Sequence, residues 1–228
     1  MKRSLINKSI EWARGVLEQN NISLPEFAYW GYEEWQKNAD DITTIRKTML
    51  GWDVTDYGSG DFDKTGSVLF TVRNGDVGDK NVGTPYAEKY IVLKPGQAIP
   101  THMHKTKAED IISRCAASYC IKLYNTGKDG KPDLQSDVDV FCDGIKKTFP
   151  PGETIEVTNG TSMTLHPYLY HSFWGMEGGQ AAVVGEVSSI NDDNTDNYFA
   201  QQVARFMEIE EDEAPLCPLC NEYSKLLG

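Results

Sequence analysis

The stretch Lys94–Arg114, KPGQAIPTHMHKTKAEDIISR, holds the residues around which the rest of the chain is organised. His102 and His104 are separated by one residue, and Glu109 follows five residues later. Residues i and i+2 of a β-strand face the same side, so both imidazoles can point at one ion. Glu109 can join them after a bend in the chain. Two histidines and a carboxylate suit a divalent metal such as Mn²⁺, Fe²⁺ or Zn²⁺, so we predict a metal site here.

The composition of the 228-residue chain is that of a folded domain, with 39% hydrophobic and 25% charged residues. A net charge of −12 argues against binding to nucleic acid, which needs a basic surface, and against docking on anionic membranes. The N-terminal stretch MKRSLINKSIEWARGVLEQN lacks the apolar run of a signal peptide. The cysteine count of five is odd, which favours reduced thiols. We therefore expect a cytoplasmic protein with no nucleic-acid or membrane partner.

Cys217 and Cys220 form a single CxxC pair near the C-terminus. A structural zinc site normally needs a second pair of ligands, and the sequence offers no second CxxC. The βαβ context of a thioredoxin-like redox pair is also missing. We interpret both residues as inert thiols.

The N-terminal part of the sequence predicts helices. Apolar residues recur at three- and four-residue steps over residues 3–20, and two shorter helices are expected over 33–37 and 41–50. Between the first two helices lies an aromatic cluster, formed by Tyr29, Trp30, Tyr32 and Trp35. These rings either pack as a lid on the core or form an aromatic wall for a sugar or a dimer contact. We expect a homodimer, with the apolar helix and this cluster as its surface.

From Gly51 onward the sequence predicts short strands separated by turns. The strands are expected at 67–73, 90–93, 110–113, 117–125, 138–142, 146–149, 153–157, 162–165, 172–175 and 181–188, with a hairpin turn at Gly127–Lys131. Strands of this length and spacing are typical of a β-sandwich or barrel. Near the C-terminus we expect a short helix over Tyr198–Phe206 and a solvated acidic run over Glu208–Glu213.

The histidine-rich stretch has a second half later in the chain. Gly160 is followed after five residues by His166, and His171 comes after Pro167. With the first half, this resembles the two-part motif of the cupins, which are double-stranded β-helix (jelly-roll) barrels. The resemblance implies a mainly β cupin barrel with helical additions at both ends, and His102, His104, Glu109 and His171 as metal ligands. His166 is the alternative to His171 as the late ligand and otherwise a candidate for binding a substrate hydroxyl.

A closer resemblance covers most of the chain. The segments HMHKTKAEDIISR (102–114), GEVS (185–188) and NDDNTDN (191–197) look like the D-lyxose isomerase family of cupins. The resemblance implies an enzyme, a manganese-dependent aldose–ketose isomerase. It would interconvert D-lyxose and D-xylulose, and D-mannose and D-fructose more slowly.

Two titratable residues can support this chemistry. Isomerisation moves a proton between C1 and C2 through a cis-enediol, which requires an acid–base group that reaches both carbons and a second that serves the hydroxyls. A divalent metal can stabilise the developing enediolate as a Lewis acid. Lys107 lies between the ligands, where burial and the cation should lower its pKa; otherwise it is a surface lysine. Glu186 interrupts the apolar strand AAVVGEV, where it is either the second acid–base group or a paired core carboxylate.

The loop after that strand offers candidates for binding sugar hydroxyls. Asp193 and Asp196 lie in it, although loops of this composition are often only turns. Arg205 is a weaker candidate, because a structural ion pair is the more common role for such an arginine.

Two other functions compete with isomerisation. A dioxygenase holding Fe²⁺ would use the same ligands, and a non-catalytic cupin could bind sugar or metal without turnover. A binding protein would not need the pair Lys107 and Glu186, so this pair favours an enzyme. We expect one cupin domain over residues 1–228, with a helical extension at 1–50 and the barrel at 52–190.

Overall fold

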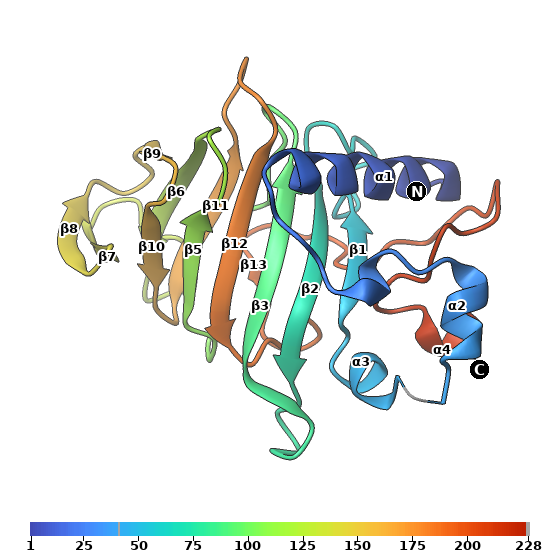
Figure 1. Cartoon of the computed structure of the whole chain (residues 1–228). Coiled ribbons are helices and arrows are strands. Elements are labelled where there is room, and N and C mark those ends of the chain that lie inside the picture. The colour runs from blue at the N-terminus through green and yellow to red at the C-terminus, as the bar shows by residue number, and fades with distance from the viewer. Residues whose placement is uncertain (41, 227–228) are drawn as a thin grey trace.

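Two antiparallel sheets face each other in the computed structural model, which describes residues 1–40 and 42–226 (Figure 1). The larger sheet has the strand order β1 (Gly51–Thr55), β2 (Ser67–Gly75), β3 (Gly83–Leu93), β12 (Ala182–Ser189), β5 (Glu109–Ser113), β10 (Ser162–Leu165), β7 (Val138–Cys142) and β8 (Ile145–Phe149). The smaller sheet has the order β13 (Tyr198–Phe199), β4 (His102–Met103), β11 (Leu169–Gly175), β6 (Tyr119–Asn125) and β9 (Ile155–Val157). The predicted cupin barrel is confirmed.

Alternation along the strands separates two hydrophobic cores. In β12, Ala182 and Val184 point between the two sheets, where they meet Leu123 and Phe173 from the smaller sheet. Val183 points the other way and belongs to a second core on the outer face of the larger sheet. Because successive side chains of a strand face opposite sides, Glu186 shares the inner face with Val184. The strand thus delivers one carboxylate into the barrel.

The helices cover the outer face of β1, β2 and β3 on the side where both termini lie (Figure 1). They are α1 (Arg3–Gln19), a 3₁₀ turn η1 (Glu26–Ala28), α2 (Tyr32–Lys37), α3 (Thr43–Lys47) and α4 (Tyr223–Leu226). Ile6, Ile10 and Leu17 of α1 are at most 1% exposed and pack against the sheet. No helix in the described residues is long and apolar enough to cross a membrane.

Trp30 and Trp35 of the aromatic cluster pack on this second core, whereas Tyr29 is 51% exposed, and none of the four cluster residues lines the pocket described below. Trp35 is 1% exposed and contacts Phe27, Trp30 and Tyr223. The packing interpretation is therefore the one the structure supports. The apolar face of α1 is used in the same core, so this part of the surface that we expected to form a dimer is buried within the chain. The homodimer itself stays a prediction.

One prediction for the C-terminal segment is wrong. Residues 198–206 do not form a helix, because Tyr198 and Phe199 pair as strand β13 with β4 and satisfy their backbone groups there. The acidic residues of Glu208–Glu213 are exposed, as predicted, and two of them also contact α1: Glu211 forms an ion pair with Arg3, and Asp212 accepts hydrogen bonds from Ser4. The acidic segment thus ties the C-terminal segment to α1.

The strand predictions are otherwise close to the observed bounds. Strands β7 and β10 begin and end where the sequence predicts, and β3 begins at Gly83 instead of residue 90. Strands β1, β4 and β13 are absent from the prediction, since β4 and β13 contain two residues each and show no alternation. Gly127 and Lys131 close the predicted turn through a 2.7 Å backbone hydrogen bond.

Candidate active site

Three buried histidines converge between the two sheets. Strand β4 pairs with β11 so that His102 lies directly opposite His171, and His104 follows two residues after His102. One ring nitrogen from each histidine lies within 4.8 Å of the others. The exposed fractions are 9% for His102, 4% for His104 and 1% for His171. Antiparallel pairing thus joins the two halves of the sequence motif.

Hydrogen bonds at Nδ1 determine which ring nitrogen is free. His102 and His171 each donate through Nδ1 to the carbonyl two residues earlier, at 2.8 and 3.1 Å. His104 donates through Nδ1 to the carbonyl of Asp196 at 2.7 Å. A carbonyl only accepts, so each Nδ1 must hold the proton and each Nε2 presents a lone pair. This arrangement is the usual one for metal-binding histidines.

The environment keeps two of these rings neutral. Burial, together with His171 and His104, lowers the pKa of His102 well below its usual value. Burial and the charge of Lys107 lower the pKa of His104 to about 4. Neutral imidazole is the form that binds a metal.

Glu109 completes a four-residue set. Its Oε1 lies 3.1 Å from His171 Nε2 and 3.6 Å from His104 Nε2. Oε1 of Glu109 and Nε2 of His104 are buried, and neither has a hydrogen-bond partner among the described residues. A cation between them would satisfy the lone pairs and the carboxylate oxygen that converge in this way. The residues present therefore fit a divalent metal ion held by three histidines and one glutamate.

Lys107 uses all three of its N–H donors inside the barrel. Nζ lies 2.7 Å from Glu109 Oε2, 2.9 Å from Glu186 Oε1 and 3.3 Å from Asn191 Oδ1. Burial alone would lower the pKa of Lys107, but the two carboxylates raise it above the usual value. The predicted lowering of the Lys107 pKa is therefore not observed. The sequence does not show that two carboxylates flank this ammonium. The alternative of a surface lysine is wrong, since the residue is 4% exposed.

The two oxygens of Glu186 have different surroundings. Oε1 accepts from Lys107 at 2.9 Å and from Ser188 Oγ at 3.4 Å, and lies 3.6 Å from Lys89 Nζ. No hydrogen bond from a described residue reaches Oε2. Burial would raise the pKa of Glu186, but Lys107 and Lys89 lower it, so the carboxylate is ionised. Glu186 lines the pocket with one carboxylate oxygen that accepts no hydrogen bond, so it can act as a base.

Sequence reasoning missed Lys89, which is 3% exposed and lies between Glu186 and Asp193. Its position in β3 faces Glu186 of β12 in register. Lys89 is also in phase with the apolar residues Ile91 and Leu93, which predicts an inward side chain. The alternation is visible in the sequence, but a lysine is usually exposed, so the pattern alone does not predict a buried Lys89.

Arg205 and Asp193 extend the row of alternating charges. Arg205 lies 3.1 Å from Asp193 Oδ2 and 2.6 Å from Asp53 Oδ2. Lys89 lies 3.8 Å from Asp193 Oδ1. The ion-pair interpretation of Arg205 is thus supported, although Arg205 and Asp193 also line the pocket. Asp53, in the missed strand β1, completes the row.

Two predicted substrate-binding residues lie elsewhere. Asp196 turns its carboxylate onto the loop before β5, where it accepts from the backbone N–H groups of Lys105, Thr106 and Lys107. Its carboxylate therefore positions that loop. His166 is exposed and contacts the Phe141 ring at 6.4 Å, and it does not line the pocket. A turn at Pro167 and Tyr168 separates it from His171, so the two histidines face different regions.

The pocket beside the histidines is lined by both charged and aromatic side chains. The charged residues are Lys89, Lys107, Glu186, Asp193 and Arg205. The aromatic rings are those of Tyr57, Phe173 and Phe199, and Phe199 lies 5.4 Å from the His102 ring. Such a mixture of hydrogen-bonding groups and apolar walls suits a small polyhydroxylated molecule.

Comparison with known proteins shows the family to which this chain is similar. The profile of the D-lyxose isomerase family matches residues 1–223. A D-lyxose/D-mannose isomerase of Serratia proteamaculans is 38% identical over 230 residues, covering 100% of both chains. A protein of the same name from Escherichia coli O157:H7 is 38% identical over 224 residues and covers 98% of both chains.

Solved structures show the same fold at much lower identity. An L-ribose isomerase of Acinetobacter sp. DL28, in complex with L-ribose, superposes with a TM-score of 0.58 at 13% identity, covering 92% of this chain and 98% of the other. An L-ribose isomerase of Geodermatophilus obscurus gives a TM-score of 0.58 at 15% identity with the same coverage. The full-length family match and the close relatives lead to one conclusion: this chain belongs to the D-lyxose isomerase family of sugar isomerases.

Proposed function

We propose that this protein is a metal-dependent aldose–ketose isomerase that interconverts D-lyxose and D-xylulose, and D-mannose and D-fructose more slowly. The substrates follow from the names of the two close relatives. The observation that supports this function most strongly is Glu186, whose free Oε2 and paired Oε1 lie beside Lys107 and the histidine cluster.

The metal would be a divalent ion, and Mn²⁺ is the ion we propose. His102, His104, His171 and Glu109 would hold it, since their free Nε2 atoms and Oε1 converge. When bound, the ion would supply Lewis acidity to the carbonyl end of the sugar. Histidine and carboxylate ligands together suit Mn²⁺ and its first-row neighbours.

Glu186 is proposed as the base that moves the carbon-bound proton. Its Oε2 takes the proton from C2 of the aldose, the carbonyl oxygen O1 gains a proton, and a cis-enediol results. The proton then lost from O2 replaces the one that O1 took up, and the proton on Oε2 returns to C1, which yields the ketose. One carboxylate oxygen can serve both carbons because C1 and C2 are adjacent.

Lys107 is proposed as the group that serves the oxygens. Its ammonium lies between the carboxylates of Glu109 and Glu186, beside the ligand cluster. From there its positive charge can stabilise the negative charge that develops on O1 or O2. The polar residues Lys89, Asp193 and Arg205 are proposed to bind the remaining hydroxyls, against the rings of Tyr57 and Phe199.

Other features of the proposal concern the whole molecule. The five cysteines are free and buried, which supports a reducing compartment such as the cytoplasm. We also propose a homodimer, to be tested by light scattering. A dioxygenase would need the same ligands but has no use for the base Glu186, and the family match supports isomerisation over it.

The proposal is tested by an aldose panel. Protein loaded with Mn²⁺ is incubated separately with D-lyxose, D-mannose and other pentoses and hexoses, and the ketoses are measured. We expect D-xylulose to form fastest and D-fructose more slowly. If no aldose is converted while the metal is bound, the proposal is wrong.

A further inference from the structure

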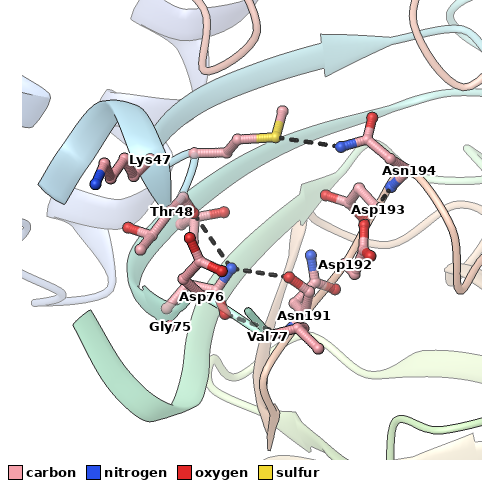
Figure 2. A pocket seen from close by; sticks show the side chains of 12 residues that line it. Lys47, Thr48, Gly75, Asp76, Val77, Asn191, Asp192, Asp193 and Asn194 are labelled. Carbon is pink, nitrogen blue, oxygen red and sulfur yellow. Dashed lines mark hydrogen bonds between the residues drawn. The ribbon is translucent and has the colours of Figure 1, made fainter. Parts of the chain in front are cut away.

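A second cavity lies outside the barrel, between the end of α3, the end of β2 and the loop that follows β12 (Figure 2). Its wall contains Asn74, which is 5% exposed and does not line the barrel pocket. The side-chain amide of Asn74 makes three hydrogen bonds to backbone groups. These bonds hold two segments in place, the end of α3 and the loop that follows β12.

Asn74 binds residue 191 at two points. Its Nδ2 donates to the carbonyl of Asn191 at 2.9 Å, and its Oδ1 accepts from the Asn191 N–H at 2.9 Å. Its Nδ2 also donates to the carbonyl of Thr48 at 3.2 Å, at the end of α3. Figure 2 shows the dashed lines from one amide nitrogen to Thr48 and to Asn191. The position and orientation of the Asn191 peptide groups are thus both determined by Asn74.

Asn191 in turn contacts Lys107. Its Oδ1 accepts from Lys107 Nζ at 3.3 Å, while Glu109 and Glu186 take the other two donors of the ammonium. Asn191 is the neutral member of the three. It sets the direction of the third N–H without adding charge, and so holds the ammonium between the two carboxylates.

A local irregularity in β2 aims Asn74 at this loop. Thr71 pairs with Lys89, but Arg73 pairs with Glu88, so the register shifts between Thr71 and Arg73 and again before Gly75. With strict alternation Arg73 would follow Thr71 to the inner face. Instead it forms an ion pair with Glu88 at 3.0 Å and is 46% exposed. Such bulges re-aim side chains near active sites, and here the side chain is that of Asn74.

We propose that Asn74 is a positioning residue for the isomerisation: it fixes Asn191, and Asn191 holds Lys107 between Glu109 and Glu186. This inference rests on the function proposed for Lys107. Asn74 touches neither the ligand set nor the pocket, so its effect must pass through Asn191. Misplacement of a catalytic group by about 1 Å can cost roughly 100-fold in rate.

The test is a double-mutant cycle with Asn74→Leu and Asn191→Ala. We expect each single variant to lower the kcat for D-lyxose by about 10- to 100-fold, with KM and bound metal unchanged. The kcat of the double variant should lie within about twofold of the kcat of the slower single variant, because both substitutions break the same link. If the fold-losses in kcat of the two single variants multiply in the double variant, the proposal is overturned.

Asn194→Ala is the matched control. Asn194 lies in the same loop and also reaches the end of α3, where its Nδ2 lies 3.9 Å from the Met49 sulfur (Figure 2). It makes no described contact with Lys107. We expect a kcat within about twofold of the wild type, since the link through Asn191 is intact. An equal loss in Asn194→Ala and Asn74→Leu would show a general loosening of the loop and would overturn the proposal.

A second readout does not depend on turnover. Hydrogen exchange at the Asn191 amide should be slow in the wild type and fast in Asn74→Leu, because Oδ1 of Asn74 is its acceptor. Asn74→Asp keeps an acceptor and should retain this protection, while losing both bonds donated by Nδ2. Unchanged exchange in Asn74→Leu would overturn the inference. A wild-type protein that isomerises no aldose but shows the expected exchange would instead contradict the proposed function.

Discussion

Each of the three clustered histidines uses one ring nitrogen on a backbone carbonyl and leaves the other free. This pattern suits metal binding, because no reorientation of the rings is needed. The two motif histidines and Glu109 could be predicted from spacing alone. The preference for His171 over His166 follows from the turn at Pro167 and the strand that begins at His171, together with the family resemblance, and the register of β11 with β4 places His171 opposite His102.

Removing a ligand should remove the metal. We expect His104→Ala to weaken Mn²⁺ binding by more than the roughly 10- to 100-fold that follows loss of a ligand's hydrogen-bond partner. The chain has four histidines, and His166→Ala is the matched control because that ring is exposed and far from the cluster. Metal content by mass spectrometry checks both. Full metal in His104→Ala, or loss in His166→Ala, would contradict the assigned ligands.

Removing the base should stop proton transfer while the metal stays bound. Glu186→Gln keeps the shape of the side chain, so we expect kcat to fall by about 10²- to 10⁴-fold with unchanged metal content. Glu88→Gln is the control, since Glu88 lies on the adjacent strand β3 but pairs with Arg73 outside the barrel. Comparable rates for Glu186→Gln and wild type would contradict the role of Glu186.

At the level of elements, the N-terminal helix is joined to the C-terminal segment by a buried arginine. Arg3 is 0% exposed and lies 2.6 Å from Glu222 Oε1 and 2.8 Å from Glu211 Oε2. The sequence does not predict this contact, because the partners are more than two hundred residues apart and the acidic run alone is typical of a solvated face. Burial of Arg3 has no local sequence signal.

Breaking this contact should destabilise the protein strongly. Arg3→Met leaves the 4% exposed Glu222 without its partner, so we expect a loss of about 3–5 kcal/mol in the free energy of unfolding. Lys225→Met removes an exposed lysine from the same Glu211 and should cost less than about 1 kcal/mol. Urea unfolding measures both. Equal costs for the two substitutions would contradict the claim that burial gives the pair its strength.

At the level of the whole molecule, the site lies between two sheets, and most of their strands could be predicted from the sequence. Inward alternation explains Glu186 and Lys89, but the bulge in β2 and the two-residue strands β4 and β13 depend on contacts between distant segments. The row of charges from Glu109 to Asp53 likewise arises only when four strands (β1, β3, β5 and β12) and the three connecting segments that carry Lys107, Asp193 and Arg205 are assembled. Sequence patterns predict which side of a strand each side chain faces. The contacts that each side chain makes depend on strand register and on loops from distant parts of the chain.

Stability of the whole chain should fall in acid. The hydrogen bond from Arg3 lowers the pKa of Glu211 to about 2, and Arg205 and Lys89 lower the pKa of Asp193 well below its usual value despite burial. A lowered folded-state pKa contributes stability that is present above the unfolded-state value of about 4 and is lost as the pH falls below it. Urea unfolding of chelator-treated protein between about pH 7 and pH 3 measures this without metal release.

The Arg3→Met variant separates the contribution of Glu211. Without its guanidinium partner, the pKa of Glu211 should move toward 4.5, its ordinary value. The acid loss of unfolding free energy should then be smaller than in the wild type. Identical pH dependence in the two proteins would show that the ion pair makes no contribution to acid sensitivity.

The central claim is that one metal ion, held by His102, His104, His171 and Glu109, enables this chain to isomerise D-lyxose. The most direct measurement is the rate of D-xylulose formation as Mn²⁺ is added to chelator-treated protein. We predict no ketose in the metal-free protein and a rate that rises linearly to a plateau at about one bound ion per chain, as a single site requires. Full activity without metal, or no D-xylulose at saturating Mn²⁺, would contradict the account.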